Sequence, residues 1–122
     1  MASTVVLIMS TESVLLFESL ARCTAVWVAD TPANAALKYR LTTERKSLSI
    51  TWFPVHPDEQ LEAAAVRISF SLDDHFNEEA QQPGYRSLLV IGAQYKSSMN
   101  EKLAVLGFKH VEPTVFGFIA AK

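Results

Sequence analysis

Three polar residues follow the first strongly apolar segment of the chain. The run Val5–Met9 leads directly into Ser10, Thr11 and Glu12. In an open α/β sheet, ligands bind at the carboxyl ends of the strands, near the point where the strand order reverses. If residues 4–9 form a central parallel strand, this polar turn is the first place where we expect a ligand site.

Two further polar residues belong to the same candidate crevice. Tyr95 follows the fourth apolar strand, and Asp30 ends the second, where dinucleotide-binding folds place an acid that binds ribose. Such folds also need glycines after the first strand, and the turn Met9–Glu12 has none. We therefore expect Asp30 to cap a helix that starts at Pro32. The ligand crevice predicted from these patterns comprises Ser10, Thr11, Asp30 and Tyr95.

Other patterns that indicate chemistry are weak. Asp73-Asp74-His75 resembles a metal cluster, but three consecutive residues on a helix do not face one point. No His-Glu-x-x-His motif and no Gly-x-Ser-x-Gly elbow is present, and we expect Cys23 to be a partly buried filler residue. The sequence therefore predicts no catalytic residues, no metal site and no cofactor.

Bulky aromatic residues suggest an interaction surface instead. Trp52 and Phe53 are consecutive on a predicted strand, so their side chains point to opposite faces of the sheet. An edge strand cannot hide both rings unless each face is covered. Phe116 adds a third ring near the end of the chain. Aromatic residues are favoured in the cores of protein interfaces, so packing under the helices and partner binding are both open for these rings.

A short acidic segment is the second element of that surface. It contains Asp73, Asp74, Glu78 and Glu79. Acidic side chains on one helix are typical of a solvated face, and they also complement a basic partner protein.

The elements that position these residues alternate along the chain. We expect strands at residues 4–9, 25–29, 47–53, 87–91 and 111–121, the last as one strand or a short hairpin. We expect helices at residues 11–22, 33–41, 58–80 and 98–106, the last opened by a capping box at Ser98 and Glu101. This alternation predicts an α/β fold: a three-layer α/β/α sandwich with a mostly parallel sheet of about five strands. The strand order 3-2-1-4-5 fits best, with 2-1-3-4-5 as the alternative.

Residues 58–80 fit two patterns. Leu61, Ala65, Ile68 and Leu72 have helical spacing, whereas the apolar residues of 66–72 alternate with polar ones as in a strand. We favour the helix because a crossover between parallel strands needs one.

Composition limits the classes of function. The chain has 122 residues, so we expect one domain over residues 1–122, and its net charge of −2 argues against nucleic-acid binding. One cysteine excludes an internal disulfide. No apolar run reaches the roughly 20 residues of a membrane span, and the run at residues 5–9 is short for a signal peptide, so we expect no membrane association and a cytoplasmic protein.

Two hypotheses follow. The favoured one is a small protein-binding module (an inhibitor, an immunity-type protein or an adaptor) that binds a basic partner through Trp52, Phe53, Phe116 and the acidic helix. The alternative is a small enzyme or ligand-binding domain that uses the crevice at the ends of strands one and four. A homodimer paired through an edge strand is compatible with either.

Overall fold

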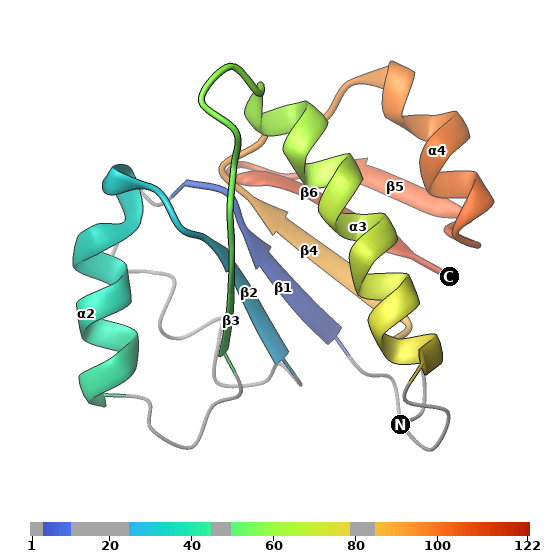
Figure 1. Cartoon of the computed structure of the whole chain (residues 1–122). Coiled ribbons are helices and arrows are strands. Elements are labelled where there is room, and N and C mark those ends of the chain that lie inside the picture. The colour runs from blue at the N-terminus through green and yellow to red at the C-terminus, as the bar shows by residue number, and fades with distance from the viewer. Residues whose placement is uncertain (1–3, 11–24, 45–49, 79–84) are drawn as a thin grey trace.

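The computed structural model describes residues 4–10, 25–44, 50–78 and 85–122 (Figure 1). The predicted helix at residues 11–22 lies outside these residues, as do Thr11, Cys23 and Glu79.

A six-stranded mixed sheet forms the centre of the α/β fold. β1 pairs in parallel with β2 and β4, and β2 pairs in parallel with β3. β6 is antiparallel to both β4 and β5, which gives the order β3-β2-β1-β4-β6-β5. The strands are β1 (Thr4–Ile8), β2 (Ala25–Ala29), β3 (Ile50–Phe53), β4 (Ser87–Ile91), β5 (His110–Pro113) and β6 (Gly117–Ala121).

The strand order confirms the favoured prediction as far as β4 and corrects it beyond. The last segment is an antiparallel hairpin, which was one of the two predicted alternatives, so the sheet has six strands instead of about five and is mixed. The reason is local. A parallel strand needs a crossover of about a dozen residues, whereas the short turn after Pro113 reverses the chain at once. Pro113 ends the edge strand β5, where a missing N–H is tolerated.

The ambiguous segment at residues 58–80 is a helix, so the strand alternative is wrong. α3 (Leu61–Glu78) buries Ala65, Ile68 and Leu72 in the core. Val66 is also buried and Phe70 packs against the same cluster. The strand-like alternation arises because α3 is apolar on two sides: one packs on the sheet, and the other faces α4 (Asn100–Val105).

Apolar side chains form two clusters, one on each face of the sheet. On β1, Val5 and Leu7 belong to the cluster that contains residues of α3 and α4. Val6 and Ile8, which point the other way, belong to the cluster around α2 (Ala35–Glu44). Figure 1 shows α3 and α4 in front of the sheet and α2 beside it.

The two ends of α4 are closed in different ways. A 3-10 turn over Ser97–Met99 precedes α4, and the residue before α4, Met99, makes no side-chain capping bond, so the predicted capping box is wrong. The C-terminal end of the helix is closed by a glycine turn. Gly107 has φ +92°, and the Phe108 N–H donates to the carbonyl of Leu103, which closes the helix end.

One buried carboxamide joins the carboxyl ends of β1 and β2. Asn34 lies in the 3-10 turn η1 (Pro32–Asn34) and is 1% exposed. Its Nδ2 donates to the carbonyl oxygens of Met9 at 3.2 Å and Ala29 at 2.9 Å. The carbonyl of Ala29 also accepts from the Thr31 N–H at 3.0 Å, so Asn34 adds a bond to that carbonyl and joins the two strand ends through one side chain.

Replacing Asn34 tests this role. Asn34→Ala removes both of these buried hydrogen bonds, so we expect a loss of about 1–3 kcal/mol in the free energy of unfolding. Asn34→Asp, of the same shape, should lose at least as much at neutral pH because a carboxylate has no N–H to donate. Urea titration gives the values. Gln94→Ala, at an exposed site, is the control, and a loss for Asn34→Ala no larger than the control's contradicts the role.

Candidate functional site

A cavity lies where the predicted crevice was expected, at the carboxyl ends of β1 and β4. Its volume is about 290 Å³. It is lined by the end of β1, the end of β4, the first residue of α3 and the tip of the β5–β6 hairpin. These lining residues are Ser10, Leu61, Ile91, Gly92, Val115 and Phe116.

Gly92 holds the floor of this crevice together. The N–H of Met9 donates to Ile91 O at 2.8 Å, and the N–H of Gly92 donates to Phe116 O at 2.8 Å. Gly92 has φ +84°, and a Cβ at this position would overlap the backbone of Ser10. Only glycine allows both the conformation and the close approach, so this residue fixes β1 against β4 and the hairpin tip.

The hairpin tip presents apolar side chains at the mouth of the crevice. Val115 is 93% exposed and Phe116 is 51% exposed. The turn beneath them is closed by two bonds: Thr114 N–H to Gly117 O at 2.9 Å and Gly117 N–H to Thr114 Oγ1 at 3.0 Å. A second cavity of about 210 Å³ shares Gly92, Val115 and Phe116. These two hydrogen bonds therefore fix the turn, and Phe116 lines both cavities from it.

Asp30 lies at the neighbouring strand end and does not cap the next helical turn. The residue before that turn is Thr31, and it makes no side-chain capping bond. The Asp30 carboxylate instead accepts from Lys38 Nζ at 3.4 Å. The prediction that Asp30 caps the helix is therefore wrong. Both side chains of this pair are about half exposed, and such surface ion pairs add little stability, so the carboxylate can readily exchange Lys38 for another partner.

Tyr95 turns away from the crevice, although the sequence grouped it there. Its hydroxyl donates to Asn100 Oδ1 at 2.6 Å, and its ring meets Phe118 edge-on with centroids 6.0 Å apart. Tyr95 packs against the core cluster on the α3 side. Of the predicted crevice residues, Ser10 lines the cavity, Asp30 stands one strand away and Thr11 lies outside the described residues.

The predicted aromatic surface is not one patch. Trp52 and Phe53 do point to opposite faces: Trp52 packs beside the α2 cluster, with Lys38 Nζ 5.1 Å from its ring centroid, and Phe53 is 4% exposed in the other cluster. Phe116 follows β5, and three strands separate β3 from β6. Of these three rings, Phe116 is the exposed one.

The acidic residues on the last turns of α3 lie at the opposite end of the sheet from Phe116, because α3 runs back from the end of β3 toward the start of β4 (Figure 1). Asp74 is exposed, whereas Asp73 is half-buried and lies 3.4 Å from Lys122 Nζ. The side chain of Glu78 and all of Glu79 lie outside the described residues.

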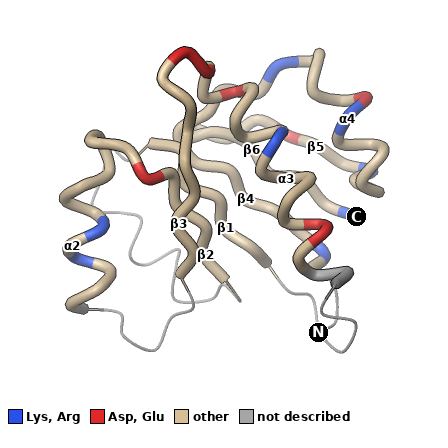
Figure 2. The backbone as a smooth tube through the Cα atoms, in the orientation of Figure 1, with Lys and Arg blue, Asp and Glu red and all other residues tan. Residues whose placement is uncertain are grey.

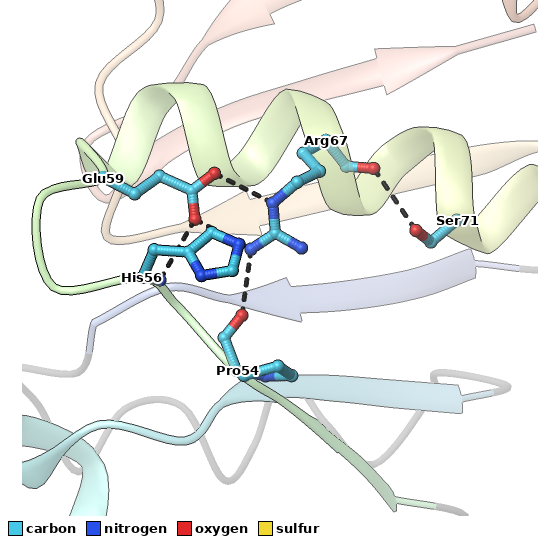
Figure 3. Close-up of polar contacts among 5 residues, drawn as sticks. All are labelled: Pro54, His56, Glu59, Arg67 and Ser71. Atoms are coloured by element: carbon cyan, nitrogen blue, oxygen red, sulfur yellow. Dashed lines mark hydrogen bonds and ion pairs between the residues drawn. The ribbon is translucent and has the colours of Figure 1, made fainter.

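An ion pair fixes the connection that brings Leu61 to the crevice (Figure 3). Arg67 donates from Nε and Nη2 to the two carboxylate oxygens of Glu59, each at 2.8 Å, and Nη2 also donates to Pro54 O at 2.9 Å. The same carboxylate accepts from the His56 N–H at 3.3 Å. These bonds tie the stretch between β3 and α3 to the second turn of the helix. The bond from Arg67 lowers the pKa of the Glu59 carboxyl below its ordinary value.

The pH dependence of stability follows from that pKa. Glu59 is more acidic in the folded chain, so its contribution is present above the unfolded pKa of about 4.3 and is lost as the pH falls below it. We expect Glu59→Gln to reduce the free energy of unfolding at pH 7 and to reduce its loss between pH 5 and 3. Glu62→Gln, in the first turn of α3, is the matched control. Equal pH profiles for the two variants contradict the assignment.

No helix among the described residues is long and apolar enough to cross a membrane. Within the same residues, no group of three His, Cys, Asp or Glu side chains is placed to hold a metal ion. No model of a known protein family matches the chain, and no curated protein is similar to it in sequence. A function must therefore be argued from the geometry of the crevice.

Proposed function

We propose that this chain is a small-ligand-binding domain that uses the crevice at the carboxyl ends of β1 and β4. The observation that carries the proposal is the position of the cavity lined by Ser10, Gly92 and Phe116. It lies at the point where the strand order reverses, since the chain proceeds outward from β1 to β2 and β3 and then returns to pair β4 on the other side of β1. Open α/β sheets bind ligands at this point.

Helices on both faces of the sheet support this use of the fold. In the three-layer α/β/α arrangement that we propose, α2 covers one face and α3 and α4 the other. The carboxyl ends of the strands then remain uncovered by these helices. The crevice lies at this end of the sheet, and ligand binding there does not require catalysis.

The lining chemistry favours a flat, uncharged ligand. The described lining residues contain no charged side chain, and they combine the Phe116 ring and apolar groups with one hydroxyl, that of Ser10. A phosphate group is disfavoured because the sequence Met9–Glu12 contains none of the glycines that cradle it. Asp30 ends the adjacent strand, about 20 residues after β1, which suits a ribose diol. We infer a nucleoside or a similar heteroaromatic compound.

Binding of adenosine tests the proposal. We expect amide resonances of Ser10, Gly92 and Phe116 to shift on titration with adenosine, and Phe116→Ala to weaken binding about tenfold because stacking on an aromatic ring is worth about 1–3 kcal/mol. Tyr39→Ala, which removes an exposed ring on α2, should leave affinity unchanged.

Two outcomes would contradict the proposal. One is the absence of any shift at the crevice up to the solubility limit of adenosine. The other is tighter binding of ATP than of adenosine, since extra affinity from the triphosphate requires cations that the described lining residues do not supply.

Protein binding is the second candidate, and the exposed hairpin tip favours it. Val115 is 93% exposed and Phe116 is 51% exposed at this tip. Apolar side chains on a rigid turn are suited to anchor a partner. Replacing both tip residues with serine should abolish capture of such a partner, whereas Tyr39→Ser should retain it. Asp74→Asn is a further control: Asp74 lies near the far end of α3 from the tip, so this variant should retain both capture of the partner and adenosine binding.

A further inference from the structure

A larger cavity lies between α3 and the segment that leads into α4. Its volume is about 560 Å³, within the range of small-molecule sites. It is separate from the crevice, since no residue lines both. It is lined by side chains from the first three turns of α3 on one side and from residues 96–102 on the other.

Apolar side chains line the inner part of this cavity. Val66 and Met99 are buried members of the core, and Phe70 is half-buried and packs against the same cluster. A ring together with a thioether is a favourable surface for an aromatic or alkyl group, because the sulfur is polarizable and adapts its shape. The inner part thus favours the apolar body of a ligand.

The rim is cationic. Lys96 and Lys102 line the cavity with exposed side chains, and within the described residues neither ammonium group makes an ion pair or a hydrogen bond. Figure 2 shows basic positions on both sides, on α3 and on the stretch that includes α4. Glu62 is the one acidic residue among those that line the cavity, so positive charge prevails there.

Arg67 supplies a third, pre-oriented donor. It lines the same cavity, and its Nε and Nη2 are held by Glu59 and Pro54 O (Figure 3). Nη1 takes no part in these bonds and keeps its N–H donors. A guanidinium that is already fixed loses less freedom when it binds a carboxylate than a free side chain does.

We propose that this cavity binds a small amphipathic carboxylate, with its apolar body against Val66, Phe70 and Met99 and its head group near Lys96 and Lys102. The lysine stems extend the apolar wall while their ammonium groups stay in water near the head group. An uncharged ligand gains only the apolar part of this environment. The proposal stands independently of the crevice, whose described lining carries no charge.

Matched probes separate charge from shape. Indole-3-acetate and indole-3-acetamide have the same ring and differ in the head group, and octanoate offers an alkyl body in place of the ring. We expect indole-3-acetate or octanoate to shift amide resonances of α3 and of residues 96–102, with the amide about tenfold weaker than its acid. No shift with either carboxylate, or equal binding of the acid and the amide, overturns the proposal.

A double lysine variant with a matched control locates the head group. Lys96→Gln combined with Lys102→Gln should weaken indole-3-acetate about tenfold and leave the amide unchanged. Lys109→Gln, at an exposed lysine that does not line the cavity, should change neither. Phe116→Ala, at the crevice, should also leave this binding intact, so failure here is distinct from failure of the adenosine test. Carboxylate binding that persists unchanged in the double lysine variant overturns the proposal.

Discussion

The crevice depends on the close approach of the carboxyl ends of β1 and β4. Met9 N–H bonds Ile91 O, and Gly92 leaves no room for a side chain against the backbone of Ser10. From the same residue, the Gly92 N–H holds Phe116 O at the tip of the hairpin. One glycine therefore aligns three segments that are distant in sequence. Without that contact, the crevice would have neither its floor nor its aromatic mouth.

Local patterns predicted the elements well where one physical effect dominates. β2 and β4 have the predicted bounds, because strands buried on both faces are continuous apolar runs. The helix at Leu61–Glu78 was predicted together with a strand alternative, because its two buried sides produce both periodicities at once. The final hairpin was left open by the sequence, since an apolar segment with a turn inside it does not specify whether its halves pair. In the structure the two halves, β5 and β6, pair with each other, and β6 also pairs with β4.

The site was harder to predict than the fold. Ser10 was correctly expected at the crevice from its place after β1, and the ends of β1 and β4 do lie side by side. Leu61 and Phe116 were not expected to line it, because only tertiary bonds bring them there: Arg67 to Glu59 for the start of α3, and Gly92 to Phe116 for the hairpin. Tyr95 was misplaced because the chain turns after Gly92 and directs the ring to the core. The feature of the sequence that could have indicated the close approach of these segments is Gly92, directly after the predicted strand at residues 87–91.

The first turns of α3 separate two environments of opposite character. Leu61 faces a crevice whose described lining is uncharged, whereas Ala63 and Val66 line a cavity bordered by Lys96 and Lys102. The Glu59–Arg67 pair fixes this part of the helix, and its two charges offset each other. The net positive charge at the second cavity therefore comes from Lys96 and Lys102, which bias that side toward anions. The charge difference across one helix is the physical reason to expect two ligand classes rather than one.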